Sequence, residues 1–144
     1  MQNMWFKPYQ LEELKRDARC AGMAESIGFE VLEIREEALV GRIPVDHRTK
    51  QPFGILHGGA SCVLSESLGS IAAWMCINPA EKMAVGLEIN ANHIRSVSDG
   101  YVTGICKPLH IGRRTHVWQT DMYNDENKLT CTSRLTIAII DKKT

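Results

Sequence analysis

The sequence lacks an excess of charge of either sign. Its 144 residues include 17 Lys plus Arg and 17 Asp plus Glu, so the formal net charge is zero. Proteins that bind nucleic acid normally carry a basic excess, and we therefore expect no nucleic-acid partner. An anionic ligand would have to be held by a local group of basic side chains.

Cysteine pairs and long apolar runs are missing as well. The five cysteines are odd in number and no two of them form a CxxC, so we expect neither a disulfide framework nor a metal site. Reduced thiols are typical of the cytoplasm. The first ten residues do not resemble a signal peptide, and no run of about 18 apolar residues occurs. We expect a cytoplasmic protein with no membrane span and no cofactor.

Periodicity and turn residues indicate one domain over residues 1–144. They predict a short helix, two strands, a long apolar helix and four further strands. The expected helices are 11–21 and 59–76, and the expected strands are 29–34, 39–45, 84–97, 101–109, 116–123 and 129–140. Turn residues between the last four strands favour an antiparallel meander. Such a sheet with one apolar helix to cover is expected to curl around it, which is the α+β hotdog fold.

The long helix carries one residue that does not suit it. Glu66 lies between apolar flanks, and a buried carboxylate costs free energy unless it is paired or used. Its pKa would be raised, which suits a general base or a nucleophile. Alternatively, Glu66 belongs with Ser67 and Ser70 to a narrow polar stripe that faces solvent. The apolar residues on both sides of Glu66 favour the functional interpretation over this one.

The start of this helix, His57-Gly58-Gly59, is a second candidate. Free backbone N–H groups there can polarise a carbonyl oxygen, although for the two glycines taken alone a tight turn is the favoured explanation. Gly58 and Glu66 are about 12 Å apart along the helix, so one substrate carbonyl cannot contact both. If both act on one bond, they come from two chains across a two-fold interface.

Several other chemistries find no support. Residues 59–63 (GASCV) begin like the G-x-S-x-G motif of a nucleophile elbow, with Ser61 at the serine position. Val63 occupies the position of the second glycine, so the motif is incomplete. There is no HExxH and no P-loop.

Four segments together resemble the hotdog-fold acyl-CoA thioesterases of the PaaI-like family. They are residues 51–61 (QPFGILHGGAS), 66–70 (ESLGS), 86–93 (GLEINANH) and 107–112 (KPLHIG). The similarity extends from about Leu11 to Ile140. It is strongest to the branches that act in menaquinone and enterobactin biosynthesis. It implies an acyl-CoA substrate with an aromatic acyl group, such as 1,4-dihydroxy-2-naphthoyl or hydroxybenzoyl, and a homodimer that pairs into a homotetramer.

The resemblance also implies residue roles. Glu66 would be the nucleophile or the general base, and the Gly58 N–H would polarise the thioester carbonyl. Gln51 and His57 would orient the thioester or water, and Ser70 would assist. The residues that would hold coenzyme A are Gly86, His93, Ile94, Arg95, Ser96, His110, Ile111, Gly112, Arg113, Arg114 and Thr115.

The basic residues in that set fit coenzyme A without the resemblance, because an arginine fork matches phosphate oxygens. We expect Arg95, Arg113 and Arg114 to cluster near turns, with ordinary surface charges as the alternative for any one of them. Phe53, Trp74 and Met75 are candidates for an acyl pocket or for the core. A hotdog dehydratase or hydratase, and a non-catalytic acyl-CoA-binding module, are the competing functions.

Overall fold

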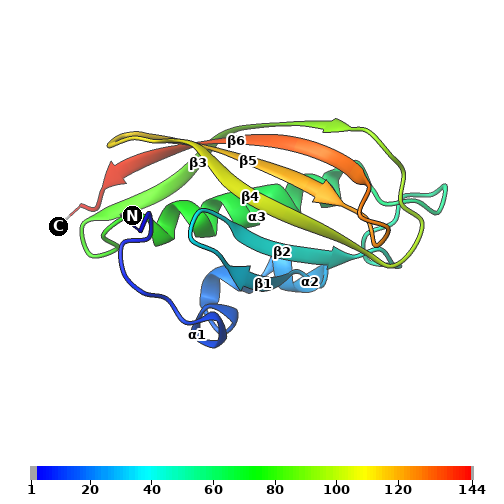
Figure 1. Ribbon diagram of the computed structural model, residues 1–144, viewed down its shortest axis with the longest axis horizontal. Coiled ribbons are helices and arrows are strands. Elements are labelled where there is room, and N and C mark those ends of the chain that lie inside the picture. The colour runs from blue at the N-terminus through cyan, green and yellow to red at the C-terminus, as the bar shows by residue number, and fades with distance from the viewer. Residues whose placement is uncertain (1–2, 144) are drawn as a thin grey trace.

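The long apolar segment folds into helix α3 (Gly58–Met75), one residue earlier at each end than predicted. The computed structural model describes residues 3–143. Most of α3 is buried, including Leu64, Leu68 and Ile71, and the sheet curves around it (Figure 1). One strip of the helix is only partly covered, and this strip carries Glu66 and Ser70.

Six strands form one antiparallel sheet in the order β1-β2-β4-β5-β6-β3. Their bounds are β1 (Glu30–Ile34), β2 (Leu39–Pro44), β3 (Lys82–His93), β4 (Tyr101–Ile111), β5 (Thr115–Tyr123) and β6 (Leu129–Asp141). The hotdog arrangement is confirmed. The expected meander holds for β4, β5 and β6 only, because β3 pairs with β6 and forms an edge of the sheet.

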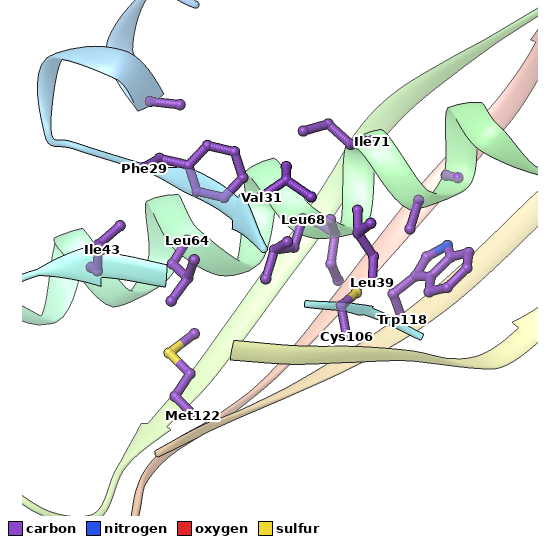
Figure 2. Packing of buried hydrophobic residues seen from close by; sticks show 14 of the residues in the cluster. Phe29, Val31, Leu39, Ile43, Leu64, Leu68, Ile71, Cys106, Trp118 and Met122 are labelled. Atoms are coloured by element: carbon purple, nitrogen blue, oxygen red, sulfur yellow. The ribbon is translucent and has the colours of Figure 1, made fainter. Parts of the chain in front are cut away.

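The core lies between α3 and the inward faces of the strands. Side chains alternate along β5, where Trp118 and Met122 point inward and are fully buried. Leu64 and Leu68 pack against the sheet side chains from the helix (Figure 2). Each buried leucine contributes about 1.5–3 kcal/mol relative to an exposed one. This packing fixes the rotation of α3 and therefore which side chains occupy its uncovered strip.

The N-terminal helix predicted over residues 11–21 is wrong as one element. The structure has α1 (Leu11–Lys15), a 3-10 turn η1 (Ala18–Cys20) and α2 (Met23–Ser26). Asp17 is extended and its side chain accepts from the Arg19 N–H, which starts a new turn. Gly22, expected to end the helix, has a φ of 72° and begins α2 instead. Figure 1 places these turns on the side of α3 away from β5 and β6.

The predicted strand over residues 84–97 ends four residues early, at His93. The N–H groups of Ile94 and Arg95 both turn to the carbonyl of Thr130, which ends the ladder. The carbonyl of Val97 accepts from Leu56 in the loop before α3. Among residues 3–143, no helix is both long and apolar enough to cross a membrane.

Candidate functional site

Glu66 lies where the partly covered strip of α3 meets β3. It takes part in none of the ion pairs found among residues 3–143. Burial raises the pKa of its carboxyl above the ordinary value, because the charged form loses water without gaining a counter-ion. A carboxylate in this state is a stronger base than one in water.

Gly86 of β3 lies directly against this carboxylate. A Cβ at position 86 would collide with Oε1 of Glu66, so only glycine leaves room for the side chain as it is placed. The register of β3 on β6 also shifts between Gly86 and Glu88. Gly86 was predicted to hold coenzyme A, and in this chain its contact is with Glu66.

A pocket of about 570 Å³ opens beside Glu66. We call it the Glu66 pocket. It is lined by α3, by the start of β3 and by the η1–α2 turns: Glu66, Ser67, Ser70, Ile71, Trp74, Lys82, Met83, Ala84, Pro79, Arg19, Ala21, Met23, Ala24 and Lys142. It therefore brings together two of the predicted catalytic residues, Glu66 and Ser70.

The three aromatic and apolar candidates for an acyl pocket have different surroundings. Trp74 lines the Glu66 pocket. Met75 is fully buried in the core, because it faces the sheet on the opposite side of α3, and Phe53 is 90% exposed at the tip of a loop. Within one chain, Trp74 therefore lies at the pocket and Met75 in the core, which were the two predicted alternatives, and Phe53 has neither position.

His57 and Gly58 form the N-terminus of α3, away from the Glu66 pocket. Nδ1 of His57 accepts from the Gly59 N–H at 2.7 Å and caps the helix. The Gly58 N–H has no acceptor among the hydrogen bonds of residues 3–143. The ring of His93 lies against Gly58, since a Cβ there would be 2.8 Å from Nε2. A free N–H at a helix start is a donor for a developing oxyanion.

Gln51 belongs to the loop before α3. Its Oε1 accepts from the backbone N–H of Phe53, and its carbonyl accepts from Gly54. His57 and Lys50 share a smaller hollow of about 280 Å³ that does not include Glu66. One chain thus keeps the Gln51–Gly58 segment and the Glu66 pocket apart, in agreement with their separation along the helix.

The residues predicted to hold coenzyme A lie at opposite ends of the sheet. Arg95 follows the end of β3, where its Nη1 donates to the carbonyl of Leu129 at the start of β6. Arg113 and Arg114 lie in the β4–β5 turn and share a groove of about 560 Å³ with Lys82 at the start of β3. The eleven residue steps from Lys82 to His93 span about 36 Å. The expected cluster of three arginines is therefore not formed within one chain.

The remaining residues of this set flank these positions. Ile94 and Ser96 are exposed beside Arg95. His110 and Ile111 end β4, Gly112 lies in the β4–β5 turn, and Thr115 begins β5. The His110 ring folds over Gly112, where a Cβ would lie 2.5 Å from its Nε2.

Two features of the site region escaped sequence reasoning. Arg19 reaches the Glu66 pocket and stacks on Trp74. No pattern signals this contact, because residues 11–21 look like an ordinary charged helix. His116 is buried beside Trp118, and burial together with nearby His110 lowers its pKa to about 4. It is therefore neutral at pH 7 and belongs to the core.

Comparisons with known proteins identify the family of this chain. A family model described as the thioesterase superfamily matches residues 53–131. The chain is 48% identical over 142 residues to 1,4-dihydroxy-2-naphthoyl-CoA hydrolase of Escherichia coli, covering 95% of this chain and 99% of that protein. It is 41% identical over 138 residues to the proofreading thioesterase EntH of Cronobacter turicensis, covering 95% and 98%.

Solved structures show the same fold. A mutant thioesterase from Pseudomonas aeruginosa superposes with a TM-score of 0.93 at 40% identity, covering 96% of this chain and 99% of that one. A thioesterase from Haemophilus influenzae gives 0.90 at 44% identity, with 96% and 95% covered. With the matched family model spanning both Gly58 and Glu66, the chain belongs to the thioesterase superfamily and is a thioester hydrolase with the hotdog fold.

Proposed function

We propose that this protein hydrolyses acyl-CoA thioesters with an aromatic acyl group, and that Glu66 is the catalytic carboxylate. The observation that carries the proposal is the Glu66 pocket, in which a desolvated carboxylate with no ion-pair partner among residues 3–143 lies one helical turn from Ser70. The similarity to a 1,4-dihydroxy-2-naphthoyl-CoA hydrolase supports an aromatic acyl-CoA. By the same similarity, the protein would act in menaquinone biosynthesis.

In this mechanism, Glu66 attacks the thioester carbonyl or removes a proton from the attacking water. The Gly58 N–H stabilises the oxyanion, and one such donor contributes about 3 kcal/mol. Gln51 and His57 orient the thioester or the water, and Ser70 assists the reaction. The free Nε2 of His57 supports this role, because its Nδ1 is already occupied by the helix cap.

Gly58 and Glu66 meet if two chains pair along β3. This edge strand exposes Met83, Val85 and Leu87, and an exposed apolar edge is a template for another strand. Within one chain, Gly58 at the start of α3 lies against His93 at the end of β3. Glu66, further along α3, lies against Gly86 of β3. A two-fold axis that sets Gly86 opposite the partner's His93 therefore sets Glu66 opposite the partner's Gly58. A homodimer of this kind has two equivalent sites.

The same pairing brings Arg95 of one chain close to Arg113 and Arg114 of the other, although these residues are far apart within a single chain. Around that axis, residues 93–96 of one chain lie beside the start of the partner's β3, where Lys82, Arg113 and Arg114 share a groove. This set carries the positive charge that coenzyme A phosphates require. Association of dimers into a tetramer is a further part of the proposal. The five unpaired cysteine thiols favour a reducing compartment, the cytoplasm.

Replacing Glu66 with glutamine tests the proposal, since it removes the carboxylate and keeps the shape. We expect kcat on aroyl-CoA to fall at least about 10²-fold, while the Kd for the acyl-CoA changes little. Free thiol release measures turnover, and calorimetry measures binding. Glu37→Gln, which changes an exposed carboxylate in the turn between β1 and β2, is the matched control and should remain active. Unchanged turnover in Glu66→Gln would refute the mechanism.

Single-turnover hydrolysis in heavy-oxygen water tests for a covalent role of Glu66. Label in the Glu66 carboxylate indicates a covalent anhydride whose Glu66 carbonyl is attacked by water. Label in the released acid alone is the result for a general base or for an anhydride attacked at the acyl carbonyl. The same assay excludes a dehydratase or a binding module, because neither of them releases free thiol.

A further inference from the structure

Arg19 lines the Glu66 pocket but has no part in the proposed chemistry. It comes from η1, and its guanidinium carbon lies 3.6 Å from the ring centroid of Trp74. Its Nη1 donates to Asp17 at 2.6 Å. A guanidinium has five N–H donors in a fixed plane, so this single bond leaves donors for a ligand. The stacking on Trp74 and the bond to Asp17 hold the plane at the wall of the pocket.

The pocket has a direction that α3 defines. Glu66, Ser70 and Trp74 are spaced by four residues and lie on one face of the helix. Ser70 is therefore about 6 Å and Trp74 about 12 Å from Glu66 along the axis. If the thioester carbonyl is at Glu66, the far end of the acyl group points toward Trp74 and Arg19. This step rests on the proposed function of Glu66.

The middle of the pocket is suited to a flat apolar group. Four apolar side chains contribute to its lining: Ile71, Met23, Met83 and Ala84. Methionine side chains adapt to irregular shapes and make favourable contacts with aromatic rings. Met23 is 70% exposed and Met83 is 44% exposed, so both gain burial when a ring occupies the pocket.

The charges of the pocket are divided between its residues. Glu66 is the acidic lining residue, and Arg19, Lys82 and Lys142 are basic. Lys82 is already paired with Asp141. A hydrocarbon end would displace water from the Arg19 guanidinium and leave its donors unpaired, which costs free energy. An oxygen at the end of the acyl group would accept from those donors.

We propose that Arg19 determines acyl specificity in this enzyme. It selects aromatic acyl groups that carry a hydroxyl or another hydrogen-bond-accepting oxygen at the end remote from the thioester. Trp74 supports the selection by holding the guanidinium plane in place.

The test compares kcat/KM for 4-hydroxybenzoyl-CoA and benzoyl-CoA in the wild type and in Arg19→Met, which removes the charge and keeps most of the length. We expect the wild type to prefer the hydroxylated substrate and Arg19→Met to lower that preference about tenfold, since a hydrogen bond to a charged group is lost. Arg19→Lys should retain part of the preference. Arg16→Met changes an exposed arginine that lines a different groove, and it should behave as the wild type.

The outcomes separate this inference from the proposed function. No preference in the wild type, or an equal loss on both substrates in Arg19→Met, would overturn the role of Arg19 and leave it as a support of the pocket wall. Glu66→Gln is assayed in parallel on both substrates. If that variant stays active, the proposed function fails. If it is inactive and Arg19→Met leaves the preference unchanged, only the specificity role fails.

Discussion

At the scale of single residues, Glu66 is partly buried and has no ion-pair partner within the described part of the chain. The low polarity of its surroundings raises the pKa of its carboxyl above the ordinary value of 4.5. The charged form is therefore destabilised in the folded protein, and the protein tolerates that cost at a position where a basic carboxylate is useful.

This shift predicts the pH dependence of activity. Because the carboxylate is the active form, kcat/KM should fall as the pH drops through the raised pKa of Glu66. A pH–rate profile of the free enzyme measures this limb. An acid limb at or below pH 4.5 would contradict a desolvated Glu66.

The raised pKa of Glu66 also makes the stability of the fold depend on pH. Stability falls as the pH rises, whereas activity increases. The folded state holds the Glu66 proton more tightly than the unfolded state, so rising pH through this window removes stability. Glutamine does not titrate. The difference in free energy of unfolding between Glu66→Gln and the wild type should therefore grow in favour of the variant as the pH rises, and then level off.

At the scale of elements, the N–H of Gly58 at the start of α3 can be removed by substitution with proline without breaking the helix. Gly58 is the first helical residue, a position where proline is favoured. His57 has φ −67° and ψ 131°, a conformation that suits the residue before a proline. The Gly58 N–H has no acceptor among residues 3–143, so proline removes no hydrogen bond within the described chain.

Gly58→Pro should lower kcat by about 10²–10³ relative to Gly58→Ala, because only proline loses the oxyanion donor. Alanine is the matched control, since it also places a Cβ 2.8 Å from Nε2 of His93 but keeps the N–H. Steady-state kinetics on one aroyl-CoA compares the two, with thermal melts to check folding. Equal activity in both variants would remove the Gly58 N–H from the mechanism.

The elements also show what the sequence is able to predict. Local patterns gave α3 to within a residue and β5 and β6 nearly to their ends, because side-chain periodicity reports which face is buried. The break of residues 11–21 into α1 and η1 occurs at Asp17, whose side chain accepts from the Arg19 N–H and starts the second element. The pairing of β3 with β6 joins residues that are 38 to 59 positions apart in the sequence, and single-sequence patterns contain no information on such partners.

At the scale of the whole molecule, one chain holds two halves of the proposed site. Glu66 and Ser70 share a pocket, and Gln51, His57 and Gly58 lie around the helix start. The spacing along α3 predicts this separation from the sequence alone. The position of Arg19 and the separation of Arg95 from Arg113 come from tertiary packing, which the spacing of residues does not encode.

Mixing of two inactive variants tests most directly whether each site is shared between chains. Glu66→Gln and Gly58→Pro chains are refolded together, with different tags so that mixed dimers are captured. In a mixed dimer, the Gly58→Pro chain supplies Glu66 and its partner supplies Gly58, so one of the two sites is intact. Random pairing makes half of the dimers mixed, and the mixture should therefore recover about a quarter of the wild-type activity. Activity no greater than the sum of the two parents, with mixed dimers present, would contradict the shared site.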